Sequence, residues 1–419
     1  MTNGEASLSI AGRPLWLIVL AASTIAAIGM GLRQVMGLYL APVTDTLGLG
    51  REAFALSIAI ANIVWGLAAP VVGVVSDKYG AARVIVFGAL ATAIGLLLMC
   101  WARTDLHLVW SGVFMGLGIA GAGINATVGA VGRAAPAEER TAAIAAVGIG
   151  AGLGMLLALP YTHLLMGALG WQTSLIVLAG TALVIVALVW PLSGQPGHQT
   201  AELVPQSAGE AVREAVRLPS FWLLNLGFFV CGFHVVFYAT HLPPFVSDLG
   251  LGPEIAVWGL TVVGIGNLAG TYLAGQWGRK LPKRYGLSLI YIGRALVFLG
   301  FLFLPMTGAT VIVLSALLGV LWLSTVPLTS GLVATFFGPR WMTMLYGFVF
   351  LSHQAGSFLG VWLGGAIYDR LGSYDAMWWI SVGLALFAAL IHWPIVEKPV
   401  ARLRRPATTI LTKEVLSRE

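Results

Sequence analysis

Charged residues are scarce in this 419-residue sequence. Only 10% of its residues are charged and 58% are hydrophobic, whereas a soluble globular domain has about a quarter of its residues charged. Polar side chains are too few to cover a water-exposed surface, which excludes an ordinary soluble protein. A disordered chain is also excluded, because such chains are poor in hydrophobic residues. The composition predicts an all-α membrane protein, with lipid as its main solvent.

Cysteine is almost absent, and the motifs that hold cofactors are missing. Cys100 and Cys231 lie far apart in hydrophobic stretches, so neither a disulfide framework nor a metal site is expected. The sequence has no G-x-x-x-x-G-K-[ST] loop for a nucleotide, and no catalytic triad can be assembled from it. The basic residues fall in short loops rather than on one face, which argues against a nucleic-acid partner. We expect no cofactor, no metal and no enzymatic activity.

Twelve hydrophobic stretches are each long enough to cross a bilayer as a helix, which takes roughly 20 residues. The longest polar interval, Ser193 to Arg217, separates six stretches from six. We predict a first six-helix bundle within residues 1–194, a cytoplasmic linker at 195–217, a second bundle at 218–398 and a cytoplasmic tail at 399–419. The expected spans are 15–40, 54–75, 84–102, 108–131, 142–164, 173–194, 219–246, 255–277, 286–306, 309–336, 342–368 and 375–396.

The basic residues predict the orientation in the membrane. Of the 23 Lys and Arg residues, 18 fall on the side that carries both termini, three fall on the opposite side, and Arg33 and Arg294 lie inside spans. Cytoplasmic loops carry an excess of Lys and Arg. Both termini are therefore predicted to be cytoplasmic, in a multi-pass protein of the inner membrane, and a monomer is expected.

The two halves of the chain resemble each other at an offset of 202 residues. Six helices per copy preserve the orientation, so two parallel bundles related by a pseudo-twofold axis along the membrane normal are expected. Glycine pairs such as Gly148 and Gly152, or Gly356 and Gly360, are expected to permit close helix contacts. The recurring residues are Pro42, LGLG at 47–50, Glu52, Gly73 and Lys78, which return as Pro244, LGLG at 249–252, Glu254, Gly275 and Lys280.

The loop after the second span carries GVVSDKYGAAR, from Gly73 to Arg83, and its repeat copy is GQWGRKLPKR, from Gly275 to Arg284. The first copy resembles the motif of the major facilitator superfamily, although Ala82 replaces a common base and Arg279 stands where the second copy would have the aspartate. Gly73 is expected to allow close helix packing, and Asp77 to pair with a base or a helix N-terminus of the other bundle. The alternative is that these charges only set the topology. The resemblance assigns gating to Gly73, Asp77, Lys78, Gly80, Arg83, Arg279 and Lys280.

Two arginines lie inside the predicted spans, and none of the 17 acidic residues does. Arginine keeps its charge at any cellular pH, so each needs water, backbone carbonyls or a mobile anion as its partner. The resemblance places the span of Arg33 along a central cavity, where a guanidinium could bind a carboxylate. The alternative is that Arg33 reaches water at the outer interface. Arg294 falls in a peripheral helix of that family and is expected to bond neighbouring carbonyls.

The span 219–246 carries the densest set of polar residues. His234, Tyr238 and His241 are spaced by four and three residues, which predicts one helix face. The resemblance places this helix along the cavity too, so all three are candidate substrate ligands, and His234 and His241 are candidate proton carriers. Each histidine could instead bond a neighbouring backbone. Further candidates are Asn125, Thr127, Trp322, Ser324, Thr325 and Thr329 for the cavity, and Asn62, Asn267, His353 and Gln354 for contacts between the bundles.

Three longer stretches indicate a branch of the superfamily. RQVMGLYLAP, CGFHVVFYATHLPPF and the stretch from VPLTSGL to GVWLGG are similar to bacterial monocarboxylate porters and oxalate/formate antiporters. Monocarboxylate porters carry an aspartate and arginine pair in the eighth helix, where this sequence offers only Asn267. We predict a secondary transporter of a small organic anion, by proton symport or anion exchange. The alternatives are a proton-coupled exporter of apolar compounds, which usually needs a membrane carboxylate, and a metabolite receptor.

Overall fold

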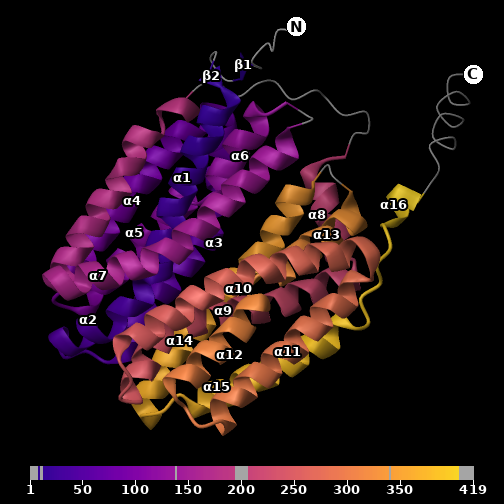
Figure 1. Ribbon diagram of the computed structural model, residues 1–419. Helices are drawn as coiled ribbons and strands as arrows, with labels where there is room; N and C mark the ends of the chain where they lie inside the picture. The colour runs from indigo at the N-terminus through magenta and orange to yellow at the C-terminus, as the bar shows by residue number, and fades with distance from the viewer. Residues whose placement is uncertain (1–7, 10–12, 137–138, 194–205, 339–340, 405–419) are drawn as a thin grey trace, which may run out of the picture.

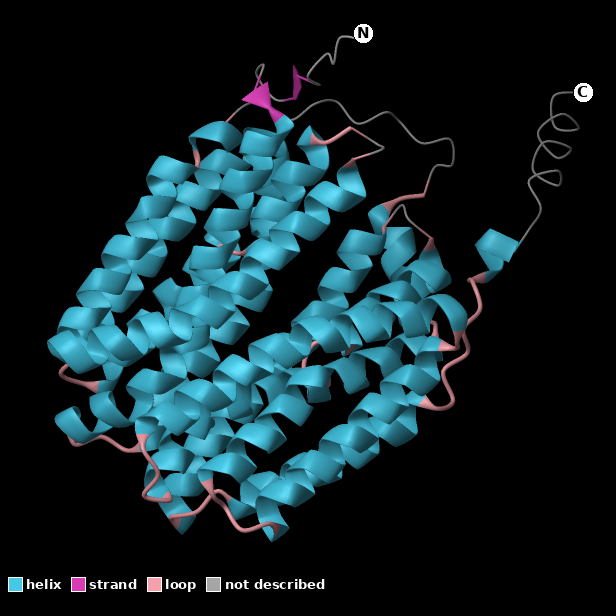
Figure 2. Ribbon diagram, in the orientation of Figure 1, coloured by secondary structure: helices cyan, strands magenta, loops and turns pink. Residues whose placement is uncertain are grey.

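The computed structural model describes residues 8–9, 13–136, 139–193, 206–338 and 341–404 (Figure 1). Within these ranges the strands are the short antiparallel pair β1 (Leu8–Ser9) and β2 (Arg13–Pro14). The rest of the regular structure is helical (Figure 2). The prediction of an all-α membrane protein is therefore confirmed.

Nine helical segments make up the first half of the described chain, and most are joined by short turns. The first span is broken into α1, η1 and α2, and the fourth into α5 and α6. The segments are α1 (Leu15–Gln34), η1 (Val35–Tyr39), α2 (Leu40–Leu47), α3 (Arg51–Tyr79), α4 (Ala81–Cys100), α5 (Asp105–Ala122), α6 (Ile124–Ala134), α7 (Arg140–Leu188) and η2 (Trp190–Leu192).

The second half repeats this pattern after a short amphipathic helix. Its tenth span is broken into α12 and α13, as the first and fourth spans are broken in the first half. The segments are α8 (Ala208–Val216), α9 (Pro219–Asp248), α10 (Pro253–Lys280), α11 (Lys283–Phe303), α12 (Gly308–Val320), α13 (Thr325–Phe337), α14 (Met342–Leu371), α15 (Asp375–His392) and α16 (Ala401–Arg404).

Ten stretches of the described residues are long and apolar enough to cross a membrane. One of them, Ala142–Leu188, has 47 residues, which is more than twice the length that one crossing needs. Its backbone leaves the helical conformation at Gly170, where φ is 75°. Residues before and after Gly170 therefore form two crossings, and the 30-residue α14 adds another. The described helices thus match the twelve predicted spans.

The helices gather into two bundles that follow the chain order (Figure 1). In the first, α1 packs on α7 and α5 packs on both α3 and α4; in the second, α9 packs on α14, α10 on α12 and α11 on α15. The pairs that join the bundles include α3 with α14, α7 with α10, and both η1 and α2 with α9. The cavity described below lies where η1 meets α9.

Small residues set the closest helix contacts, but not all of those expected. A Cβ atom at Gly356 or Gly360 would overlap carbonyl oxygens of α9, which confirms that predicted pair. The prediction for Gly148 and Gly152 is wrong, because a Cβ at Gly148 would meet nothing within 4 Å and one at Gly152 would make only an ordinary contact, 3.5 Å from Leu268. Gly154 instead packs against the backbone of Ala27. The prediction that glycines of α7 permit close helix contacts was right, but it chose glycines on the wrong face of that helix.

The predicted linker and tail contain structure where they fall within the described residues. Helix α8 begins with a capping box, in which Ser207 and Glu210 bond each other's backbone N–H groups. In the tail, the Val400 N–H donates to the Phe336 carbonyl at 3.0 Å, and Arg402 pairs with Glu214 at 3.5 Å. Residues 194–205 and 405–419 lie outside the described part of the chain.

Candidate functional site

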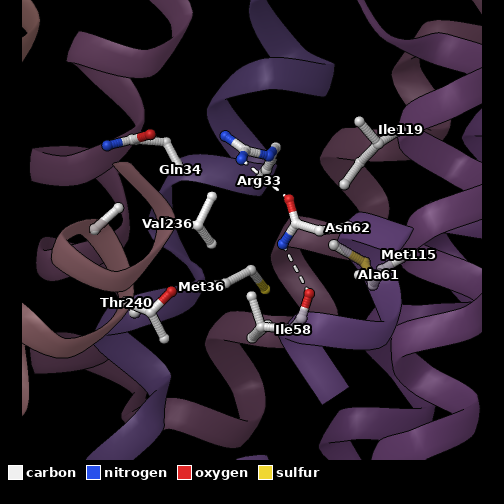
Figure 3. Close-up of a pocket in the computed structure, with 12 residues that line it drawn as sticks. Arg33, Gln34, Met36, Ile58, Ala61, Asn62, Met115, Ile119, Val236 and Thr240 are labelled. Atoms are coloured by element: carbon white, nitrogen blue, oxygen red, sulfur yellow. Dashed lines mark hydrogen bonds between the residues drawn. The ribbon is translucent and has the colours of Figure 1, made fainter. Parts of the chain in front are cut away.

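A pocket lies between the two bundles, beside the break that separates α1 from η1 (Figure 3). Its cavity volume is about 30 Å³. Gly37 of η1 lies directly against the backbone of Ala239 and Thr240, where a Cβ would overlap, so η1 and α9 meet closely beside the pocket. The lining residues are Arg33, Gln34, Met36, Gly37, Ile58, Ala61, Asn62, Met115, Ile119, Val236, Ala239 and Thr240.

Arg33 supplies the charge of this pocket. Its Nη2 donates to Oδ1 of Asn62 at 3.2 Å, and its guanidinium carbon lies 5.2 Å from the ring centroid of Trp65. Among the residues that the structure describes, no carboxylate lies within ion-pairing distance of Arg33. A guanidinium has five N–H donors, so most of them are available to a ligand. Arg33 thus lines the pocket, and its role in binding a substrate stays a prediction.

Helix α3 holds the guanidinium at two positions three residues apart. Asn62 donates its own amide N–H to the Ile58 carbonyl at 2.8 Å, which points Oδ1 at Arg33. The ring of Trp65 packs edge-on against Phe350 of α14 in the other bundle, with centroids 5.1 Å apart. From the sequence we assigned Asn62 to contacts between the bundles and did not single out Trp65. The signal available in the sequence was the spacing of three residues between them, which places both side chains on one face of the second span.

The predicted polar face of α9 exists, but it does not line the pocket. Nε2 of His234 lies 3.0 Å from the Ser381 carbonyl, and the Tyr238 hydroxyl lies 2.6 Å from Oγ of Ser315. Nε2 of His241 lies 2.8 Å from the Val361 carbonyl. All three side chains are buried inside the second bundle, while Val236, Ala239 and Thr240 face the pocket. Their roles in substrate binding and proton coupling stay predictions.

The other candidates for the cavity also lie outside the pocket lining. Asn125 is an exposed residue of α6. Trp322 is buried against Tyr238, with ring centroids 5.8 Å apart, and Oγ1 of Thr325 lies 3.2 Å from Sγ of Cys231. Of the seven predicted substrate ligands, Arg33 is the one that lines the described pocket.

Arg294 follows its predicted structural role. Its Nε and Nη2 donate to the Leu321 carbonyl at 3.2 and 2.8 Å, and Nη2 also donates to the Trp322 carbonyl. These carbonyls are free because the tenth span is broken between α12 and α13, which leaves helix-end groups without intrahelical partners. The buried guanidinium of Arg294 thus supplies hydrogen bonds to carbonyls that the break in the helix leaves without intrahelical partners. The prediction that it bonds carbonyls of a neighbouring helix is confirmed.

The gating motif lies at the turn between α3 and α4, and only part of it is described. Gly80 has a φ of 91°, a conformation that glycine adopts without strain. Gly73 does not provide close packing, because a Cβ there would meet nothing within 4 Å, so that expectation is wrong. Arg83, Arg279 and Lys280 are exposed. The side chains of Asp77 and Lys78 lie outside the described part of the chain, so their gating role stays a prediction.

A second polar cluster, which we call the Arg51 clasp, joins the bundles at the start of α3. Arg51 donates two hydrogen bonds to Asp248, at 2.6 and 2.7 Å, and one to the Tyr374 hydroxyl at 3.0 Å. The carboxylate of Asp369 accepts the backbone N–H groups of Arg51 and Glu52 at 2.9 and 2.8 Å. Burial raises the pKa of Tyr374, so its hydroxyl stays neutral. Sequence reasoning placed these residues in separate loops and missed the cluster.

Comparisons with known proteins agree with this architecture. A family model described as Major Facilitator Superfamily matches residues 15–361. Monocarboxylate transporter 11 of Mus musculus is 26% identical over 401 residues, which cover 90% of this chain and 86% of that protein. The oxalate:formate antiporter of Oxalobacter formigenes is 23% identical over 400 residues, which cover 93% of each chain. The resemblance to this branch is thereby confirmed.

A solved structure has the same fold. A bacterial homologue of the human lysosomal transporter Spinster, in an inward-facing and unoccupied conformation, aligns with a TM-score of 0.72 and 14% identity, over 90% of this chain and 96% of that one. This likeness concerns the fold alone. Because the family model covers well over half of the sequence, the chain belongs to the Major Facilitator Superfamily of membrane transporters.

Proposed function

We propose that this protein is a secondary transporter of a small organic anion, and that Arg33 binds the carboxylate of its cargo. The site works by alternating access, in which the two bundles expose the pocket to one side of the membrane at a time. The protein lies in the inner membrane as a monomer with both termini in the cytoplasm. The names of two relatives, a monocarboxylate transporter and an oxalate:formate antiporter, support an anionic cargo.

The observation that carries this proposal is the incomplete pairing of Arg33. Elsewhere in the described chain, Arg51 pairs with Asp248, and Arg294 donates through Nε and Nη2 to the carbonyls of a broken helix, although its buried Nη1 has no partner among the described residues. Arg33 has one neutral amide oxygen and an aromatic ring as its partners. A permanent cation in a poorly solvated pocket gains most from an anion that brings two oxygens to its fork of donors.

The pocket favours anion exchange over proton symport. Its lining contains no carboxylate and no imidazole, whereas a proton-coupled site needs a group that titrates near the cargo. Exchange of one anion for another requires no such group. Proton symport through His234 or His241 is the competing prediction. It requires that a proton bound inside the second bundle, away from the pocket lining, influences the binding of the cargo. Export of apolar compounds is the second alternative, and the charge of Arg33 disfavours it.

The Arg51 clasp supports the alternating-access part of the proposal. With the termini in the cytoplasm, α3 begins at the outer surface, so the clasp closes the outer side of the pocket. The same helix then passes the pocket, where Asn62 contacts Arg33. Movement of α3 against α14 would therefore open the clasp and move a wall of the binding site together.

Transport measurements in proteoliposomes test the proposal. Arg33→Gln is expected to lower uptake of labelled short carboxylates by about thirtyfold or more, because it removes one partner of a poorly solvated charge pair. Arg33→Lys, which keeps the charge but loses the bidentate fork, should retain part of the activity. The matched control is Arg103→Gln, which changes an exposed arginine outside the pocket. If the Arg33→Gln protein takes up labelled carboxylates at the wild-type rate, the proposal that Arg33 binds the anion is refuted.

The same vesicles separate the two coupling modes. Exchange predicts that uptake depends on unlabelled acid preloaded inside and persists without a pH gradient. Proton symport predicts that a pH gradient drives accumulation into empty vesicles, and that His234→Gln or His241→Gln abolishes the pH dependence.

A further inference from the structure

We propose that Cys231 is ionised, that its thiolate is the resident counter-ion of Arg294, and that this thiolate is a proton-binding site inside the second bundle. The site lies at the break between α12 and α13, and neither residue lines the pocket of Arg33. The inference is independent of the cargo proposed above. It assigns a charge and a ligand, the proton, to a cysteine that the proposed transport function does not use.

The first observation is that Arg294 lacks a negatively charged partner. Its side chain is 1% exposed, and arginine keeps its charge at any cellular pH. Nε and Nη2 donate to neutral carbonyls, and the buried Nη1 has no partner among the described residues. None of the ion pairs between described residues includes Arg294. A buried charge without an opposite charge is strongly destabilising, so an anion is required close to this guanidinium.

The second observation is the set of donors around the sulfur of Cys231, which is fully buried. Nη2 of Arg294 donates to Sγ at 3.4 Å, and Oγ1 of Thr325 lies 3.2 Å from the same atom. The Thr325 hydroxyl forms no other hydrogen bond within the described residues, so its hydrogen points to the sulfur. A thiol sulfur is a weak acceptor. A cation and a hydroxyl donor directed at one sulfur stabilise the thiolate instead.

Cys100 shows the opposite arrangement in the same chain. Its Sγ donates to the Gln172 carbonyl at 3.4 Å, which requires that the proton is on the sulfur. No hydrogen bond from a cation to Cys100 is present in the described part of the chain. Cys100 is only 3% exposed, so burial does not distinguish the two cysteines. Their neighbours do.

The third observation is the position of the two charges on the broken tenth span. The guanidinium of Arg294 binds the Leu321 and Trp322 carbonyls, at the C-terminal end of α12. The sulfur of Cys231 lies beside Thr325, the first residue of α13, and α13 begins without a side-chain cap. A helix attracts cations to its C-terminus and anions to its N-terminus. Each charge of the proposed pair therefore lies at the helix end that its sign stabilises.

The neighbouring side chains do not supply the negative charge. The Tyr291 hydroxyl donates to the Gly227 carbonyl at 2.5 Å and so keeps its proton, and an imidazole is neutral or cationic. When the thiolate binds a proton, an S–H bond forms and Arg294 keeps its charge, so acidification removes the anion that joins the two halves of the tenth span. The other ionisable side chains that interact with Cys231 or Arg294 are Tyr291, Tyr346, His353 and His234.

Infrared spectroscopy of the purified protein tests the assignment, because the S–H stretching band lies apart from other protein bands. Cys100→Ser leaves Cys231 as the single thiol, and Cys231→Ser leaves Cys100. At pH 7 an ordinary cysteine is thiolate to only a few per cent. We expect no S–H band from Cys100→Ser at pH 7 and a band that appears reversibly on acidification. Cys231→Ser, the matched control, should show the band of Cys100 throughout.

Two variants in the Cys100→Ser background test the partners of the sulfur. Arg294→Gln should restore the S–H band at pH 7, whereas Arg294→Lys should not. Thr325→Val, a milder change that removes one donor, should make the band appear at a higher pH than in its parent. An S–H band of equal strength at pH 7 in the two single-thiol proteins would overturn the inference. A titration that neither Arg294→Gln nor Thr325→Val alters would overturn the pairing with Arg294.

Discussion

The Arg51 clasp makes a quantitative prediction about the conformational equilibrium of the transporter. Arg51→Gln is expected to shift the protein from a state closed at the clasp towards a state open there. The clasp joins α3 of the first bundle to α9 and α14 of the second, and these contacts must break when the bundles separate at this end. Their loss therefore changes the free energy of one state and not of the other.

The magnitude follows from the geometry. An exposed ion pair contributes about 0.2–1 kcal/mol, but Arg51 and Asp248 are bidentate and their side chains are only 15% and 32% exposed. Charge-assisted hydrogen bonds of this kind contribute about 1.5–3 kcal/mol. The guanidinium carbon also lies 3.7 Å from the ring centroid of Tyr368, which adds about 0.5–1 kcal/mol. A total of about 3 kcal/mol corresponds to a shift of roughly a hundredfold.

The measurement is a spin-label distance across this end of the molecule. Asp105 and Glu254 are exposed residues at the starts of α5 and α10, so cysteines there report on the separation of the bundles, while Cys100 and Cys231 are buried. Arg51→Gln should populate a longer distance that is rare in the wild type, and Asp248→Asn combined with it should add little. The background control is Arg103→Gln. Identical distance distributions in Arg51→Gln and the wild type would refute the reasoning.

Two further predictions concern the pocket and the helix packing. Asn62→Asp places a carboxylate beside Arg33, so this resident counter-ion should compete with the cargo and weaken anion binding by about a hundredfold, measured by thermal shift, whereas Asn62→Ala should have a smaller effect. Binding at wild-type affinity by Asn62→Asp would show that Arg33 does not meet the anion. Gly154→Val should lower the Tm by several degrees, because its side chain overlaps the backbone of Ala27. Gly148→Val, which faces open space, should leave the Tm unchanged; equal effects of the two would refute the contact.

The sequence predicted those features that depend on hydrophobic length and on isolated charges. Twelve spans follow from the length that a helix needs to cross hydrocarbon. Arg33 and Arg294 stood out because a charged side chain inside a membrane span has a high free-energy cost. The carbonyl partners of Arg294 were inferred correctly. The breaks in the first, fourth and tenth spans were missed, although discontinuous helices are a feature of transporter sites. Gly123, at the junction of α5 and α6, gave a weak signal among 53 glycines.

Features that depend on the rotation of a helix about its axis could not be predicted. The spacing of His234, Tyr238 and His241 placed them on one face, but spacing does not say which neighbour that face meets. In the structure they meet carbonyls and hydroxyls of the second bundle. Gly148 and Gly152 failed for the same reason. The Arg51 clasp was missed because Arg51 and Asp248 lie 197 residues apart in the sequence, and no local pattern connects them.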